Sequence, residues 1–134
     1  MTTDDKKKTL AQYRLQQAQE SLEEAHYLFN GSKSLRSVAN RLYYGMFYAV
    51  LALLIFEPYT SSKHTGVIAY FNKRFVKDGI FPETMGRSFN KAFDLRNRGD
   101  YREYFELTKE IVEPLLVEAT QFVLSIRTYL DKNS

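Results

Sequence analysis

The densest gathering of side chains that could bind a charged ligand is the segment LRNRGDYREY, residues 95–104. Its basic and amide groups are Arg96, Asn97, Arg98 and Arg102. Guanidinium groups bind phosphate through paired hydrogen bonds, and the free N–H groups at a helix N-terminus also attract anions. We expect one helix to end at Gly99 and the next to begin at Asp100, which would bring both devices together. A structural role fits equally well, because basic residues stabilise a helix C-terminus and Arg96 could pair with Asp94 or Asp100.

The two histidines give weaker indications of chemistry. Glu23 and His26 have the E-x-x-H spacing by which one helix of a di-iron bundle supplies metal ligands, but such a site needs a second copy. His64, the other histidine, follows Ser61 at this spacing instead of a glutamate. The chain also contains no cysteine, so a thiolate metal site is excluded. We therefore expect no metal site and no cofactor, and interpret both histidines as ordinary helix residues.

Four aromatic residues lie close together in one apolar stretch: Tyr43, Tyr44, Phe47 and Tyr48. Aromatic rings can stack on nucleic-acid bases. At helical spacing in a central helix they more often form core, with the tyrosine hydroxyls hydrogen-bonded at its rim. We expect the core role and keep base stacking as the alternative.

Helical periodicity extends over nearly the whole chain, which has only three prolines and six glycines. Apolar residues recur at spacings of three and four, and capping residues mark the ends. The expected helices cover residues 7–29, 35–56, 63–76, 82–97 and 100–130. Gly31 suits a left-handed cap of the first helix, and Gly79 closes the third. Asp100 and Glu103 would cap the fifth, which Pro114 should kink or divide.

These elements predict an all-α fold, an up-and-down four-helix bundle with one short extra helix, because short loops make neighbouring long helices antiparallel. Residues 1–6 are expected to be disordered, and residues 7–131 to form a single domain.

The longest apolar run, residues 45–56, is shorter than the about 20 residues of a bilayer span, so we expect a soluble, cytoplasmic protein without a membrane partner. The net charge of +3 permits a phosphate-bearing partner without requiring one.

Three segments taken together resemble the HEPN family: ANRLYYGMFYAVLALL (39–54), SSKHTGVIAYFNKRFVKDGIFP (61–82) and DLRNRGDY (94–101). The resemblance is strongest to the small stand-alone bacterial and archaeal members, and it covers roughly residues 10–130. It implies an up-and-down four-helix bundle with a short extra helix, in agreement with the periodicity. It also implies a homodimer in which the motifs of two subunits line one cleft, and a minimal nucleotidyltransferase as antitoxin partner.

The resemblance further implies a metal-independent ribonuclease motif, in which an arginine and a polar residue are followed by a histidine. Arg96 matches the motif arginine and Asn97 the polar residue. Arg102 stands at the histidine position, and no histidine follows Arg96 anywhere in the chain. Arginine stays protonated, so Arg102 can hold a phosphate but cannot accept a proton. Tyr104 matches a tyrosine that the partner adenylylates in one toxin group, and is an expected modification site if it is exposed.

We therefore expect a HEPN component of a two-gene toxin–antitoxin-like system that binds RNA or nucleotide phosphate. The expected binding residues are Arg96, Asn97, Arg98 and Arg102, with ribonuclease activity weak or lost. One alternative is an active metal-independent ribonuclease toxin, in which Arg96 and Asn97 are catalytic and His64 could substitute for the missing base. The other alternative is a helical bundle that binds only protein.

Overall fold

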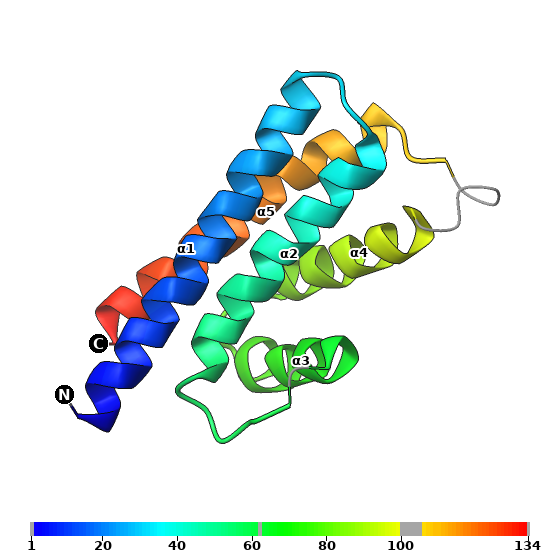
Figure 1. The fold of residues 1–134 in the computed structure, drawn as a ribbon. Helices are drawn as coiled ribbons and strands as arrows, with labels where there is room; N and C mark the ends of the chain where they lie inside the picture. The colour runs from blue at the N-terminus through cyan, green and yellow to red at the C-terminus, as the bar shows by residue number, and fades with distance from the viewer. Residues whose placement is uncertain (1, 62, 100–105, 134) are drawn as a thin grey trace.

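The computed structural model describes residues 2–61, 63–99 and 106–133, and every regular element among these residues is a helix. The elements are α1 (Thr3–Asn30), α2 (Leu35–Leu54), α3 (His64–Phe71), the π-helix η1 (Asn72–Lys77), α4 (Glu83–Gly99) and α5 (Lys109–Lys132). The prediction of an all-α, up-and-down bundle with a short extra helix is confirmed (Figure 1). Within the described ranges, no helix is both long and apolar enough to cross a bilayer.

Helix α2 is the centre of the bundle. It packs against α1, α4 and α5, and it also contacts α3. Figure 1 shows α1 and α2 as a long antiparallel pair with α5 alongside, while α4 and the short α3 lie on the other side of α2. Side chains that α2 directs toward α3 and α4 are therefore held by a helix that is itself packed on several sides.

The core follows the predicted apolar stripes. The buried members are Leu15, Ala18, Leu22 and Ala25 on α1, Met85, Phe89 and Ala92 on α4, and Leu115, Ala119, Phe122 and Ile126 on α5. Arg96 continues the α4 stripe by one more turn and is half-buried. An arginine can bury its aliphatic stem along apolar surface while its charged head stays accessible, so this position brings a guanidinium to the end of the core.

The predicted start of α1 and the predicted left-handed cap at Gly31 are wrong. The helix begins at Thr3 instead of about Lys7, because the side chains of Thr2 and Asp5 cap it reciprocally. At its C-terminus the residue with positive φ is Ser32, at 56°, whereas Gly31 has a φ of −85°. The residues expected to be disordered therefore include the first turn of α1.

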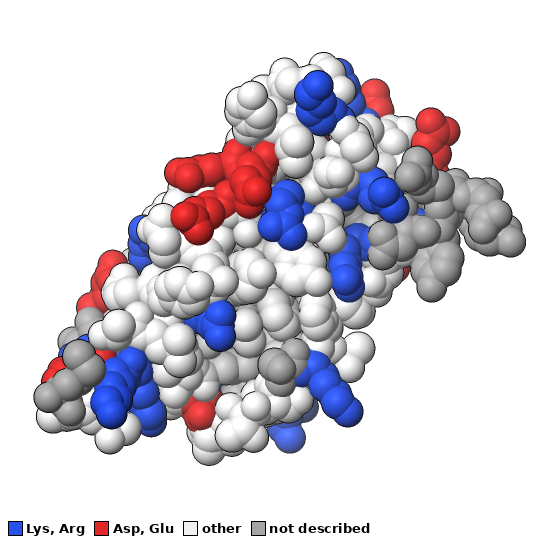
Figure 2. All heavy atoms as spheres, viewed as in Figure 1, with Lys and Arg blue, Asp and Glu red and all other residues white. Residues whose placement is uncertain are grey.

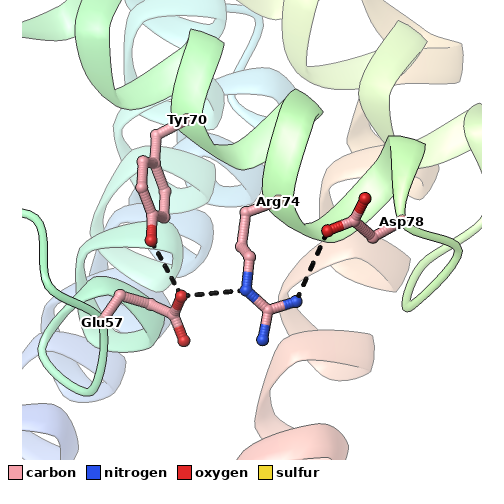
Figure 3. A network of polar contacts seen from close by, with 4 residues as sticks. All are labelled: Glu57, Tyr70, Arg74 and Asp78. Carbon is pink, nitrogen blue, oxygen red and sulfur yellow. Dashed lines mark hydrogen bonds and ion pairs between the residues drawn. The ribbon is translucent and has the colours of Figure 1, made fainter.

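The expected third helix is two elements, α3 and the π-helix η1. The chain leaves η1 through Gly79, whose φ of +84° confirms its expected role in closing this segment. A polar network ties this segment to the end of α2: the Glu57 carboxylate accepts hydrogen bonds from the Tyr70 hydroxyl at 2.9 Å and from Arg74 Nε at 3.1 Å (Figure 3). Arg74 also lies 3.9 Å from Asp78. The network fixes α3 and η1 relative to α2.

The start of α5 also differs from the prediction. Residues 106–108 are not helical, so the fifth helix begins at Lys109 and not at Asp100. The expected capping pair Asp100 and Glu103 lies outside the described residues. Because of the later start, Pro114 falls in the second turn, and α5 continues through it without dividing. Because Pro114 has no N–H, the backbone carbonyl of Glu110 lacks its helical hydrogen bond from residue 114. Glu110 is exposed and lies in the first turn of α5.

Candidate functional site

Arg96 lies in the last turn of α4, with its guanidinium beside two tyrosines of α2. Its Nη2 donates to the Tyr44 hydroxyl at 3.2 Å, and its Nη1 donates to Asn97 Oδ1 at 3.3 Å. The guanidinium carbon lies 5.4 Å from the centre of the Tyr44 ring and 5.7 Å from that of Tyr43, within the range of cation–π attraction. The structure thus brings Arg96 and Asn97 together and gives the guanidinium a fixed orientation.

His64, the first residue of α3, reaches the same place. Its Nδ1 lies 2.8 Å from the Tyr43 hydroxyl, and its ring stacks on Phe47 with the centroids 4.4 Å apart. The His64 ring also lies edge-on to Tyr44, at 5.8 Å. His64 and Arg96 therefore share Tyr43 and Tyr44 as neighbours. We call Arg96, His64, Tyr43 and Tyr44 the Arg–His cluster.

Burial and charge keep the imidazole of His64 neutral near neutral pH. Partial burial lowers the pKa of His64, and the neighbouring Arg96 guanidinium lowers this pKa further. Burial raises the pKa of the Tyr43 phenol against a smaller lowering effect of Arg96, so Tyr43 keeps its proton. Because Nδ1 of His64 is engaged with Tyr43, Nε2 is the ring atom left for a ligand. A neutral imidazole can accept or donate one hydrogen bond there, according to its tautomer.

Arg96 has no acidic partner in the part of the chain that the structure describes. None of the ion pairs between described residues includes it, and its buried Nε has no hydrogen-bond acceptor among them. A half-buried cation has lost part of its hydration, and an anion would offset that loss. Within the Arg–His cluster, Arg96 is thus the group best suited to bind an anionic ligand.

A hollow of about 460 Å³ adjoins Arg96 between α4 and the first half of α2. Its lining residues are Leu28, Arg36, Ser37, Asn40, Arg41 and Arg96. We call it the α2–α4 pocket. Figure 2 shows basic side chains gathered over this part of the molecule, next to a group of acidic side chains on α1. No role was predicted for Arg36, Asn40 or Arg41 from the sequence, although Arg36 and Asn40 lie four residues apart, a spacing that places side chains on one helix face.

Of the remaining predicted binding residues, the structure describes Arg98 alone. Arg98 is exposed, and its Nε lies 3.0 Å from a carboxylate oxygen of Asp94, so Asp94 pairs with Arg98 and not with Arg96. Arg102 and Tyr104 lie outside the described residues, and so does Asp100. Their expected roles in phosphate binding and modification stay predictions.

The E-x-x-H pair lies on the exposed surface of α1. Glu23 and His26 are exposed, and His26 Nε2 lies 3.3 Å from Thr120 Oγ1 on α5. No group of three or more His, Cys, Asp or Glu residues gathers closely enough to hold a metal within the described ranges. In the aromatic group of α2, Tyr43 and Phe47 are buried, as the core interpretation predicted. Tyr44, which is half-buried, instead faces Arg96.

Comparison with known proteins shows the family to which the chain belongs. The family model of the HEPN domain matches residues 11–128. The chain belongs to the HEPN domain family. A UPF0332 protein of Thermotoga maritima is 35% identical over 127 residues, which cover 95% of this chain and 96% of that protein. A protein of Methanocaldococcus jannaschii named as a candidate toxin is 34% identical over 116 residues, covering 87% and 78% of the two chains.

A second protein of the same archaeon, also named as a candidate toxin, is 36% identical over 113 residues, or 84% of this chain and 83% of that one. This HEPN chain is therefore similar to proteins named as candidate toxins along most of its length. Its fold places His64 of α3 beside the same two tyrosines as Arg96. Sequence spacing could not reveal this arrangement, because it depends on how α3 packs against α2 and α4.

Proposed function

We propose that this HEPN protein binds RNA or nucleotide phosphate at the Arg–His cluster. The observation that carries the proposal is the half-buried Arg96 guanidinium, oriented by Tyr44 and Asn97 and without a carboxylate partner among the described residues. A guanidinium in a fixed orientation matches the oxygens of a phosphate with paired hydrogen bonds. Asn97 and the neutral His64 would supply further polar contacts. Arg98 and Arg102 would add to the positive potential of this end of the bundle.

Within this proposal, ribonuclease activity is weak or lost. Cleavage of RNA by its own 2′-hydroxyl needs a proton acceptor and a proton donor near neutral pH, for which histidine is suited by its pKa of about 6.5. Arg102 stands where the family motif has its histidine, and an arginine remains protonated. The loss of a positioned general base typically costs about 100- to 10,000-fold in rate.

We also propose that the protein acts as a homodimer together with a minimal nucleotidyltransferase in a toxin–antitoxin-like pair. The support is its similarity to two proteins named as candidate toxins over more than four-fifths of its length. Tyr104 would be the residue that the partner modifies. Incubation of the two purified proteins with labelled ATP tests this step, since Tyr104→Phe should abolish label transfer to the chain.

Binding titrations at several salt concentrations test the phosphate proposal. A labelled single-stranded RNA and ATP are each titrated with the protein, and association is followed by fluorescence anisotropy. We expect the logarithm of the RNA association constant to fall linearly with the logarithm of salt concentration. Each phosphate contact should add about 0.7 to the steepness of this slope. If neither ligand shows salt-dependent association, the phosphate proposal is wrong and the protein-only binding module becomes the better description.

An active ribonuclease is the second candidate function, and the position of His64 favours it. In this reaction His64 Nε2 would take the proton of the 2′-hydroxyl, and the resulting oxygen would attack the phosphorus. The bond to the 5′-oxygen would break, that oxygen would leave with a proton from solvent or a second acid, and a 2′,3′-cyclic phosphate would remain. Arg96 would stabilise the charge that develops on the phosphate oxygens.

RNA integrity separates the two candidates. The protein is incubated with RNA in a chelating buffer, and the products are examined for 2′,3′-cyclic phosphate ends. Under the leading proposal cleavage is absent or slow. Rapid cleavage that disappears in both Arg96→Ala and His64→Gln, while Arg87→Ala retains it, would establish the ribonuclease and overturn the expectation of weak activity.

A further inference from the structure

The α2–α4 pocket is built from polar and basic groups of one helix face together with Arg96. The basic members are Arg36, Arg41 and Arg96, and Leu28 contributes an apolar side chain. A volume of about 460 Å³ lies in the range of small-molecule sites, about 300–1,000 Å³, and is far larger than a single inorganic ion requires. Such a lining selects an anionic, hydrogen-bonding ligand.

Arg41 is oriented within this pocket. Asn40 Oδ1 accepts hydrogen bonds from Arg41 Nε at 3.2 Å and from Nη2 at 2.9 Å. The remaining nitrogen, Nη1, lies 3.7 Å from a carboxylate oxygen of Glu24, whose side chain is 59% exposed. A long contact to an exposed carboxylate contributes little, so an anionic ligand can compete with Glu24 for this nitrogen.

Tyr44 connects Arg41 to the Arg–His cluster. The guanidinium carbon of Arg41 lies 5.3 Å from the centre of the Tyr44 ring, and that of Arg96 lies 5.4 Å from the same centre. The two guanidinium carbons are therefore at most about 11 Å apart. Arg96 belongs to both the pocket and the cluster, so the two anion-binding positions are continuous.

We infer that the α2–α4 pocket is a second phosphate subsite, with Arg41 and Arg36 holding the nucleotide next to the one bound at Arg96. This inference rests on the proposed phosphate binding and narrows its ligand from any nucleotide to a single strand of RNA. A strand carries one phosphate per nucleotide, so neighbouring phosphates can meet two guanidiniums that lie this close together. Leu28 would contact the sugar or base of the second nucleotide.

The test compares two arginine-to-alanine variants that change the net charge equally. Arg41→Ala removes the proposed contact, whereas Arg87→Ala removes an exposed arginine of α4 that pairs with Glu83 and lies outside the pocket. Binding of a short labelled single-stranded RNA and of ATP is measured at several salt concentrations. Thermal unfolding of each variant checks the fold, and Arg41→Gln, which keeps most of the side-chain stem, replaces Arg41→Ala if that variant does not fold.

We expect Arg41→Ala to weaken RNA binding about tenfold, the typical loss for a hydrogen bond to a charged group. The slope of the logarithm of the association constant against the logarithm of salt concentration should become shallower by about 0.7. Arg87→Ala should change RNA binding less than about twofold, and ATP binding should stay unchanged in both variants. The inference is wrong if Arg41→Ala behaves like Arg87→Ala toward RNA, or if it weakens ATP binding as much as RNA binding. If Arg96→Ala abolishes RNA binding and Arg41→Ala leaves it unchanged, the proposed function stands and the second subsite is wrong. If the wild-type protein binds neither ligand, both proposals fall.

Discussion

The hydroxyl of Tyr43 lies 2.8 Å from His64 Nδ1. The Tyr43 ring is fully buried and stacks near Phe89 and Phe93, so the phenol cannot turn to a different partner without disturbing the core. His64 is held in one position as a result, and Arg96 lies beside the same two tyrosines. At the scale of single residues, the site is a neutral imidazole and a guanidinium fixed by shared aromatic neighbours.

The lowered pKa of His64 gives a testable pH dependence of stability. Folding lowers this pKa below the value of about 6.5 in the unfolded chain, so the unfolded state binds more protons between the two values. The free energy of unfolding of the wild-type protein should therefore decrease as the pH falls below about 6.5. The titratable and charged groups that face His64 from α2 and α4 are Tyr43, Tyr44 and Arg96.

Urea unfolding at several pH values between 5 and 8 measures this effect in the wild-type protein and in His64→Gln. The carboxylates contribute alike to both proteins and cancel in the difference. We expect the stability of the wild-type protein relative to His64→Gln to fall as the pH is lowered. A difference that stays constant, or that rises at low pH, would show that the pKa of His64 is not lowered by folding.

At the scale of elements, the apolar stripes and most turn signals were readable from the sequence. The spacings on α1, α4 and α5 gave the buried faces correctly, and Gly79 marked the end of η1. The π-helical turn of η1 and the late start of α5 at Lys109 were not readable. Local propensity is a weak guide to such details, because tertiary context can override it.

Gly45 allows α1 and α2 to lie close together. A Cβ at this position would lie 2.9 Å from Leu22 Cδ2 and 3.3 Å from the backbone oxygen of Ala18, and Leu22 is buried. We expect Gly45→Ala to lower the free energy of unfolding by about 1 kcal/mol, because overpacking costs about 1–3 kcal/mol and helix propensity returns up to about 1.

Urea unfolding of Gly45→Ala alone and in a Leu22→Ala background measures this effect. With the leucine shortened, only the 3.3 Å approach to the Ala18 backbone oxygen remains, so the same glycine substitution should cost less than in the wild-type protein. Equal losses in the two backgrounds would show that the cost does not arise from contact with Leu22.

The network around Glu57 positions the element that carries His64. The Glu57 side chain is only 15% exposed and accepts from both Tyr70 and Arg74. A double-mutant cycle with Glu57→Ala and Arg74→Ala should give a coupling of about 1 kcal/mol, the size of a partly buried hydrogen bond to a charged group. The exposed pair Glu83 and Arg87 serves as a control and should give less than about 0.5 kcal/mol. Similar couplings for the two pairs would contradict a positioning role for the network.

At the scale of the whole molecule, the candidate site depends on three helices. Helix α4 provides Arg96 and Asn97, α2 provides the tyrosines and the pocket face, and α3 provides His64. The sequence identified the α4 contribution from the concentration of basic residues and from the family motif. From the sequence, His64 was only a possible substitute base in the ribonuclease alternative, and Arg41 had no predicted role. The positions of both near Arg96 depend on helix packing, which sequence spacing does not show.

The most direct test of phosphate binding at Arg96 compares the RNA affinities of the wild-type protein, Arg96→Ala and the charge-matched Arg87→Ala. Affinities are measured by anisotropy at several salt concentrations, and circular dichroism and thermal unfolding confirm that each variant folds. We expect Arg96→Ala to weaken binding at least about tenfold and to reduce the salt dependence, whereas Arg87→Ala stays within about twofold of the wild-type protein. Equal affinities for a folded Arg96→Ala and Arg87→Ala would contradict a phosphate site at the Arg–His cluster.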